Sequence, residues 1–205
     1  AEARVSVKAS TVSTNERAAR LLAGRGFRPV RHFWRMVREL DPDVTPELPD
    51  WPEGITVRPY FPGLDDRLIH RVIMDSFRDH WGFIEEPFEA WLQQMKGHPN
   101  FDRSLWLLAV TTASGGDDIV GVALCYPDVI DDPDMGWVGS LGVLREWRRR
   151  GIARALLHYA FGEFHRRGRA RVGLSVDAAS LTGATRLYEQ AGMRVVRQWD
   201  QYEKV

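Results

Sequence analysis

The most constraining feature of this sequence is the segment Leu141–Ala153, in which an apolar run changes abruptly into three arginines and a glycine. After that glycine, apolar residues recur at every fourth position, as they do along one face of a helix: Ile152, Leu156, Ala160 and Phe164. The segment therefore predicts a strand that runs into a tight turn, and a helix that begins at the turn.

The predicted turn has the properties of an anion-binding site. The first turn of a helix has backbone N–H groups without partners, and the helix dipole favours negative charge there. Gly151 has no Cβ that would keep a phosphate away from these N–H groups. Arg148, Arg149 and Arg150 add cationic donors for phosphate oxygens. We therefore expect this turn to bind a diphosphate.

Two segments carry a resemblance to a known family. Arg148-x-x-Gly151-x-Ala153 resembles the Gln/Arg-x-x-Gly-x-Gly/Ala motif of the GNAT superfamily of N-acetyltransferases. Residues 183–193 resemble the late helix of that family, the one near the C-terminal end of its domain, with its Ala-x-x-Leu-Tyr-Glu-x-x-Gly-Phe/Met pattern. The resemblance implies an enzyme that takes acetyl-CoA as a cosubstrate and transfers the acetyl group to an amine.

The order of the remaining elements predicts a mixed sheet. The expected elements are strands at residues 55–59, 105–110, 119–126 and 172–176, helices at 65–78 and 87–96, and a hairpin turn at Ser114–Asp117. The early strands have short connections and should be antiparallel, whereas a strand–helix–strand unit requires a parallel pair. We expect an α/β (α+β) GNAT fold, which the resemblance also implies: a mixed, mostly antiparallel sheet with a central parallel strand pair and helices on both faces.

A short repeat links the two ends of the chain. Residues 18–31 match residues 184–197 at one constant offset of 166 positions, which is the separation of Gly26 and Gly192. The identical pairs are Ala18/Ala184, Arg20/Arg186, Leu21/Leu187, Gly26/Gly192, Arg28/Arg194, Val30/Val196 and Arg31/Arg197. We interpret the chain as a fragment of a tandem GNAT protein, and the missing first GNAT unit of the parent chain as its partner.

This interpretation divides the chain into three parts. Residues 1–40 are the C-terminal remnant of a first GNAT unit, and a segment of that size cannot bury a core alone. Residues 41–54 carry four prolines and form a semi-rigid linker. Residues 55–205 have the length of a complete GNAT acetyltransferase domain, about 150 residues.

The resemblance also implies which residues bind the cofactor. The backbone of the strand before the turn, at Leu141, Gly142 and Val143, should hold the pantetheine arm and supply the oxyanion donor. The residues expected around the phosphates are Arg148, Arg149, Arg150, Gly151, Ile152, Ala153 and Arg154. Many family members have an asparagine before the late helix that contacts the cofactor arm. This chain has none there, and Ser180 could take its place.

Tyr188 and His80 are the catalytic candidates. Tyr188 stands where many GNAT enzymes carry a catalytic tyrosine, so the resemblance implies that it protonates the CoA thiolate. A phenol keeps its proton at neutral pH. Residue type alone favours packing under the sheet for Tyr188, whereas its position in the matched motif favours catalysis. The general base stays open. His80 lies in the loop between the first two helices and could titrate near neutrality, or it is an exposed loop histidine. The other candidates are acidic residues that could equally be solvated surface charges: Glu85, Glu86, Asp131, Asp132 and Asp134.

Bulk properties exclude several other classes of function. The chain has 28 basic and 28 acidic residues, so no net field attracts nucleic acid or an anionic membrane. Cys125 is the single cysteine, and no cysteine–histidine spacing indicates a metal site. No signal peptide pattern or membrane-spanning apolar run is present, and a cytoplasmic location is expected.

The sequence therefore predicts an acetyl-CoA-dependent N-acetyltransferase that acts on a primary amine of a small molecule, by direct attack on the thioester. Two alternatives stay open. One is a non-catalytic acyl-CoA-binding or interaction module, and the other is a protein or peptide N-acetyltransferase. The acceptor loops of such a scaffold vary freely, so the acceptor does not follow from the sequence.

Overall fold

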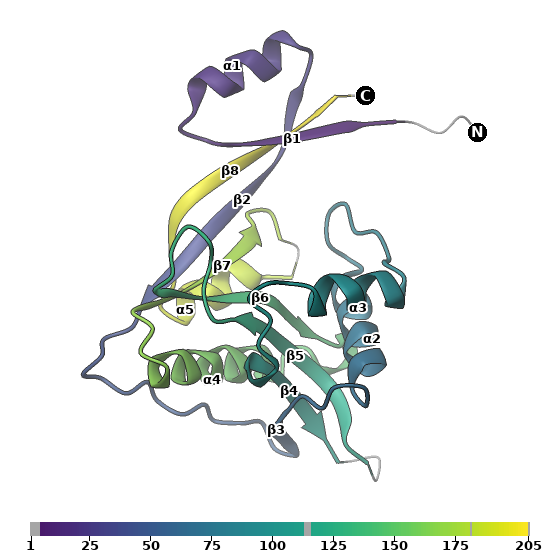
Figure 1. The fold of residues 1–205 in the computed structure, drawn as a ribbon, viewed down its shortest axis with the longest axis vertical. Helices are drawn as coiled ribbons and strands as arrows, with labels where there is room; N and C mark the ends of the chain where they lie inside the picture. The colour runs from purple at the N-terminus through teal and green to yellow at the C-terminus, as the bar shows by residue number, and fades with distance from the viewer. Residues whose placement is uncertain (1–4, 113–115, 181, 205) are drawn as a thin grey trace. The chain divides into compact units, whose positions relative to one another are not determined.

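The computed structural model describes residues 5–112, 116–180 and 182–204. The chain divides into two compact units. Unit 1 comprises residues 1–37 and 174–205, and unit 2 comprises residues 38–173. Figure 1 shows the helices and strands of both units.

Unit 2 is built on a sheet. Its strands are β3 (Ile55–Pro59), β4 (Trp106–Thr111), β5 (Asp118–Tyr126) and β6 (Met135–Val143), which pair antiparallel in this order. β7 (Arg171–Asp177) begins in unit 2, follows β6 in the sheet, and ends in unit 1. Because α4 (Ile152–Arg166) connects β6 to β7, these two strands supply the parallel pair. The predicted mixed sheet is confirmed.

Helices cover both faces of the unit 2 sheet. α2 (Asp66–Phe77) and α3 (Phe88–Lys96) agree with the predicted helices to within one residue at each end. They share a core with Val122 and Leu124 of β5. α4 lies on the opposite face, because a Cβ added to Gly121 would contact the side chains of Ile152 and Leu156. Two short 3₁₀ turns, η1 (Arg103–Leu105) and η2 (Arg145–Trp147), precede β4 and α4 respectively.

Unit 1 contains two strand–helix–strand segments. The first consists of β1 (Val7–Val12), α1 (Glu16–Gly24) and β2 (Arg28–Glu39), which runs on into unit 2. The second consists of the end of β7, α5 (Ala184–Gln190) and β8 (Arg194–Lys204). β2 and β8 begin at Arg28 and Arg194, which are equivalent positions of the sequence repeat. The repeat therefore exists in the structure as two equivalent folded segments.

The two segments of unit 1 exchange strands. β8 lies between β1 and β2, and β2 lies between β8 and β7. The pairing of β2 with β8 is symmetric about Phe33 and Trp199, which face each other and are equivalent in the repeat. The outermost pairs are equivalent as well: Arg28 with Glu203, and Val37 with Arg194. Each segment thus completes the sheet of the other.

The linker predicted at residues 41–54 contains neither helix nor strand and lies along α4. Near its start, the Asp41 carbonyl oxygen is 3.1 Å from Nε2 of His165. Near its end, the Trp51 ring centroid is 6.2 Å from that of Tyr159. The linker is therefore attached to the helix at both ends.

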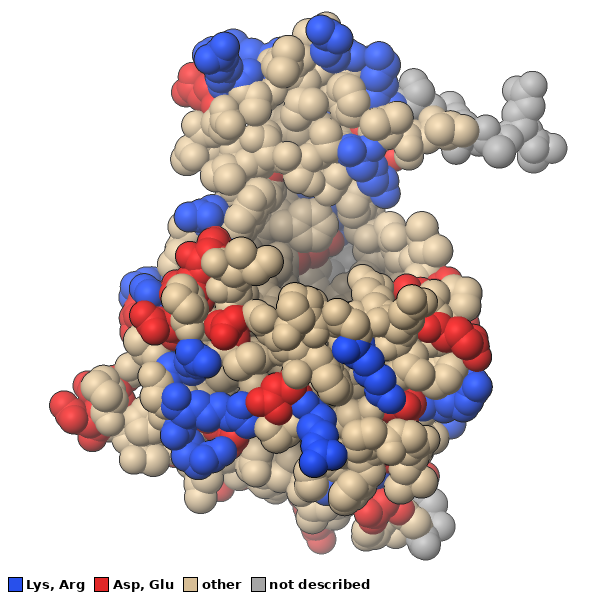
Figure 2. Space-filling model, in the orientation of Figure 1, with Lys and Arg blue, Asp and Glu red and all other residues tan. Residues whose placement is uncertain are grey.

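The surface agrees with the balanced charge of the sequence. Basic and acidic side chains are mixed over the visible face (Figure 2). Among the described residues, no helix combines the length and the apolar character needed to cross a bilayer. The first two residues of the hairpin turn predicted at Ser114–Asp117 lie outside the described part of the chain.

Candidate functional site

The connection between β6 and α4 forms the turn that the sequence predicts. β6 ends at Val143, and α4 begins at Ile152. Between them, Arg149 and Gly151 both have a left-handed backbone, with φ of 61° and 87°. The predicted order of strand, tight turn and helix is confirmed.

The N-terminus of α4 is suited to an anion. Gly151 occupies the N-cap position, where no side chain caps the first turn. The N–H groups of that turn therefore keep the positive end of the helix dipole available. A Cβ added to Gly151 would lie 3.7 Å from Cγ of Pro52, which is an ordinary contact. The positive φ is therefore a first reason for glycine at this position. The room that glycine would leave for a phosphate stays a prediction.

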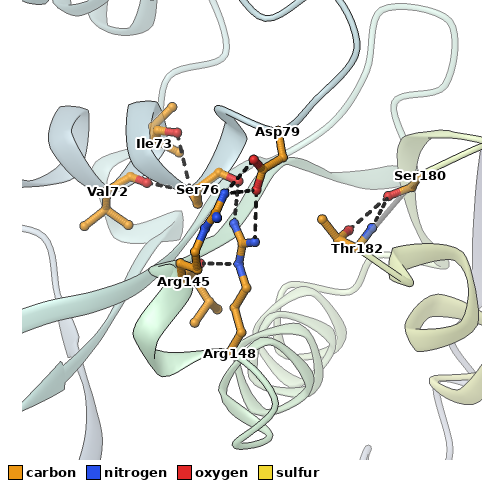
Figure 3. Close-up of polar contacts among 9 residues, drawn as sticks. Val72, Ile73, Ser76, Asp79, Arg145, Arg148, Ser180 and Thr182 are labelled. Atoms are coloured by element: carbon orange, nitrogen blue, oxygen red, sulfur yellow. Dashed lines mark hydrogen bonds and ion pairs between the residues drawn. The ribbon is translucent and has the colours of Figure 1, made fainter.

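Arg148 is directed into the protein. Its Nε donates to the carbonyl oxygen of Val143 at 3.2 Å, and its Nη2 to that of Ser76 at 3.0 Å (Figure 3). Its Nη1 lies 3.4 Å from a carboxylate oxygen of Asp79. In this conformation Arg148 joins the turn to α2, so its predicted role as a phosphate donor stays a prediction.

The other arginines of the turn lie at the surface. Arg150 donates to the carbonyl oxygen of Glu146 at 3.2 Å and lies over the Trp147 ring, 4.5 Å from its centroid. Arg149 and Arg154 are exposed. Cationic side chains therefore flank an uncapped helix N-terminus, which is the combination that favours a diphosphate.

The comparison with protein families agrees with this geometry. The model of the acetyltransferase (GNAT) family matches residues 68–193, which is more than half of the 205 residues. The chain belongs to the GNAT acetyltransferase family. The matched range begins in α2 and includes β6, the turn, α4 and α5 of this GNAT chain.

Individual GNAT relatives are longer than this chain. A mycothiol acetyltransferase from Thermobispora bispora is 34% identical over 180 residues, which make up 85% of this chain and 58% of the relative. The crystal structure of a GCN5-related N-acetyltransferase from Sphaerobacter thermophilus is 43% identical, with a TM-score of 0.82, and the match covers 99% of this chain and 60% of that one. A tandem GNAT protein from the clavulanic acid biosynthesis pathway shares the fold at 13% identity, with a TM-score of 0.71 and coverage of 98% and 64%. The chain thus spans between 58% and 64% of the length of these proteins.

The GNAT strand before the turn is β6, whose last residues are the predicted backbone binders. Leu141, Gly142 and Val143 pair with residues 121–123 of β5 along one edge. A Cβ added to Gly142 would collide with Oγ of Ser76. Glycine at this position therefore allows α2 to approach the strand closely.

A β-bulge in β6 was not predicted. The register with β5 skips Gly139, which lies between Val138 and Ser140. A Cβ added to Gly139 would be 2.5 Å from the Tyr126 ring, so glycine lets this ring cover the strand. Bulges are frequent beside active sites. Gly139 and Gly142 within one strand were the signal that could have indicated the irregularity.

Asp79 is a further site residue that the sequence analysis did not single out. Its carboxylate accepts hydrogen bonds from Nη2 of Arg145 at 2.5 and 2.6 Å. Hydrogen bonds from Arg145, and then from Arg148, hold the pKa of Asp79 below its ordinary value. These partners lie 66 and 69 residues away in the sequence, so no local pattern indicates them.

His80 follows Asp79, just after the end of α2. Its backbone N–H donates to the carbonyl oxygen of Phe77 at 2.9 Å, and its ring centroid is 4.5 Å from that of Phe77. The side chain is half-buried. His80 is therefore packed against α2 and not extended into solvent, and its role as a base stays a prediction.

Tyr188 and Ser180 belong to unit 1. Tyr188 lies in α5 and is 8% exposed, and burial raises the pKa of its phenol to about 12. It keeps its proton at neutral pH, which suits both roles considered for it, packing and proton donation. The Oγ of Ser180 lies 2.9 Å from Oγ1 of Thr182 (Figure 3).

Cys125 is a packing residue of β5. Its side chain is fully buried, and burial raises the pKa of the thiol, so a nucleophilic thiolate is disfavoured. No group of three or more His, Cys, Asp or Glu side chains within the described ranges is arranged to hold a metal ion.

Proposed function

We propose that this chain is part of an acetyl-CoA-dependent N-acetyltransferase that acetylates a primary amine of a small molecule. The observation that carries the proposal is the uncapped N-terminus of α4, with its left-handed Gly151 and exposed arginines, directly after β6. Family membership supports the reaction, and relatives named mycothiol acetyltransferase support a small-molecule acceptor. The tandem layout is also similar to that of mycothiol synthase.

The residues present fit acetyl-CoA. The N–H groups at the start of α4, from Ile152 to Arg154, would hold the diphosphate together with the side chains of Arg149 and Arg150. The backbone of Leu141–Val143 would hold the pantetheine arm and donate to the thioester oxygen. Arg148 would act through its contacts with the protein, and Ser180 would contact the arm.

The reaction begins with a neutral amine. An alkylammonium with a pKa near 10.4 costs roughly 4–5 kcal/mol to deprotonate at pH 7. A base has to accept that proton, and His80 is the residue we assign to it. The amine nitrogen then attacks the thioester carbonyl carbon, so that a C–N bond forms and the C–S bond breaks. The nitrogen loses its second proton to solvent as the amide forms.

The thiolate that leaves needs a proton, and Tyr188 supplies it. Its raised pKa keeps the phenol protonated until the thiolate forms. The match of residues 183–193 to the late GNAT helix supports this assignment. A non-catalytic acyl-CoA-binding module would bind the same cosubstrate without needing Tyr188.

We also infer that a GNAT unit precedes this chain in the parent protein. The segment 1–40 repeats the last strand–helix–strand of the chain, and relatives extend well beyond the matched length. Among the strands that the structure describes, β1 pairs with β8 alone and ends the strand order, whereas its equivalent β7 is followed by β6. The open edge of β1 is the position at which a preceding unit would continue the sheet.

Thermal unfolding with and without acetyl-CoA tests the proposed cosubstrate. Acetyl-CoA at 100 times Kd should stabilise the wild-type chain by about 2.7 kcal/mol. Gly151→Glu places a carboxylate beside the expected phosphates and should abolish the shift.

The matched control is Gly168→Glu. Gly168 follows the C-terminus of the same helix, is also left-handed (φ 71°), and has nothing within 4 Å of an added Cβ. Both variants therefore carry the same backbone strain, and the control should keep the acetyl-CoA shift. Loss of the shift in both variants would show that strain, and not the site, is responsible. No shift in the folded wild type would refute acetyl-CoA binding.

A further inference from the structure

Arg148 joins three parts of unit 2 through one guanidinium group. The group reaches the last residue of β6, the C-terminal turn of α2 and Asp79, at the carbonyl oxygens and carboxylate described above. A cation at the C-terminus of a helix is stabilised by the helix dipole. Arg148 is the first residue of the family motif, so the motif is attached to α2 as well as to α4.

Asp79 begins the segment 79–86 between α2 and α3, which is held at both ends. At the first end, Asp79 is bound by Arg145 and Arg148. At the second end, the carbonyl oxygen of Glu86 is 2.7 Å from Nε2 of His70. Between the ends, Gly82 is left-handed (φ 70°) and Ile84 is 83% exposed. The first end of the segment is therefore bound by residues of the turn where we propose that acetyl-CoA binds, Arg145 and Arg148.

We propose that Asp79 is a positioning residue which, through Arg148 and Arg145, couples acetyl-CoA binding at the turn to ordering of the segment 79–86. This inference rests on the proposed function. When acetyl-CoA occupies the turn, the arginines are fixed with it, and their carboxylate partner is fixed as well. The segment carries His80, so the cosubstrate would order the part of the chain that meets the acceptor.

A competing account predicts that the same contacts weaken acetyl-CoA binding instead of supporting it. If Asp79 only withholds Arg148 from the phosphates, removing the charge of Asp79 would release the guanidinium, and acetyl-CoA would bind more tightly. If Asp79 positions the turn, the same change loosens the turn, and acetyl-CoA binds more weakly. The sign of the change in Kd separates the two accounts.

The test compares Asp79→Asn with Asp75→Asn in the whole chain. Asp75 lies in α2, four residues before Asp79, and its side chain is 37% exposed against 35% for Asp79. It pairs with Arg78 at 2.9 Å, away from the turn. The measurements are the Kd of acetyl-CoA and amide hydrogen exchange of residues 79–86 with and without saturating acetyl-CoA. Both substitutions preserve the side-chain volume, so both variants should fold.

In the wild type and in Asp75→Asn, we expect acetyl-CoA to slow exchange in the segment by about 5-fold or more. In Asp79→Asn, we expect a weaker Kd by about 3- to 10-fold and no slowing at saturation. Tighter binding by Asp79→Asn, or slowing equal to that of the wild type, would overturn the inference and leave the proposed function intact. A wild type that does not bind acetyl-CoA would refute the proposed function, and the inference with it.

Discussion

At the scale of single residues, Arg149 is the position where the turn stores strain. It is the one non-glycine residue with positive φ in the described part of the chain, at 61°. A left-handed backbone costs a non-glycine residue about 1–2 kcal/mol. Such strain persists where the surrounding structure imposes it, and it is concentrated at functional sites. Its place between Arg148 and Gly151 agrees with a turn shaped to present N–H groups.

Arg149→Gly should separate the stability of the turn from its function. Glycine removes the strain but adds freedom to the unfolded chain, so we expect a net gain of about 0.5–1 kcal/mol in the free energy of unfolding. Loss of the cationic side chain should weaken acetyl-CoA binding by about tenfold. Denaturant unfolding and isothermal titration measure the two effects. A variant that is less stable than the wild type would contradict the claim that the backbone of Arg149 is strained.

At the scale of secondary-structure elements, the start of α2 carries a buried ion pair in place of a side-chain helix cap. Asp65 occupies the N-cap position, but its carboxylate makes no capping hydrogen bond to the helix. It accepts two hydrogen bonds from Arg58, at 2.7 and 2.8 Å, and one from the N–H of Phe61 at 2.8 Å. Burial acts to raise the pKa of Asp65, but these hydrogen bonds outweigh it and hold the pKa below its ordinary value.

Asp65→Asn should therefore be destabilising, in a way that depends on pH. Asp65 is fully buried, and removing one partner of a buried pair costs about 3–5 kcal/mol. Because the folded pKa is lowered, this stability is present above the unfolded value near 4 and is lost as the pH falls through the folded value. Urea unfolding from pH 7 to pH 2 measures this effect. The free energy of unfolding of the variant should lie below that of the wild type by a constant amount near neutral pH, and the difference should shrink in acid.

The partly exposed Asp75 again provides the control. Asp75→Asn should change the free energy of unfolding by less than about 1 kcal/mol, because a surface ion pair contributes little. If the free energies of unfolding of Asp65→Asn and the wild type still differ by the same amount at pH 2, the ionised carboxylate is not what stabilises α2.

Local patterns predicted these elements well, because helices and strands of this chain follow the spacing of their apolar residues. Ile152, Leu156 and Phe164 mark α4, and all three are buried. The same patterns could not show that Arg148 turns toward Ser76 and Asp79, since those partners come from an element about 70 positions earlier. Contacts of this kind depend on how the sheet brings separate elements together, and a motif does not contain that information.

At the scale of the whole molecule, the exchange of strands in unit 1 makes the two ends of the chain depend on each other. The repeat was visible in the sequence as seven identities at one offset. The interleaved order β1-β8-β2-β7 was not, because a repeat shows that two segments are alike and does not show how they pair. The predicted boundary at residue 55 assigns β8 to a complete domain without β1 and β2, and it stays a prediction.

A chain that begins at residue 41 tests this dependence. It lacks β1, α1 and β2, so β8 has neither of the strands with which it pairs. We expect residues 194–204 to lose their protection from amide hydrogen exchange, while β4 and β5 stay protected. Protection of β8 as in the full chain would instead support residues 55–205 as a complete domain.

The most direct test of the central claim is release of the CoA thiol from acetyl-CoA in the presence of a panel of small primary amines. We expect release that depends on the amine, and a fall in kcat of about 100-fold or more for Tyr188→Phe. Tyr202→Phe, which changes another buried tyrosine of unit 1, should keep the wild-type rate. If acetyl-CoA binds but no amine produces release, or if Tyr188→Phe and Tyr202→Phe are equally active, the proposed mechanism is contradicted.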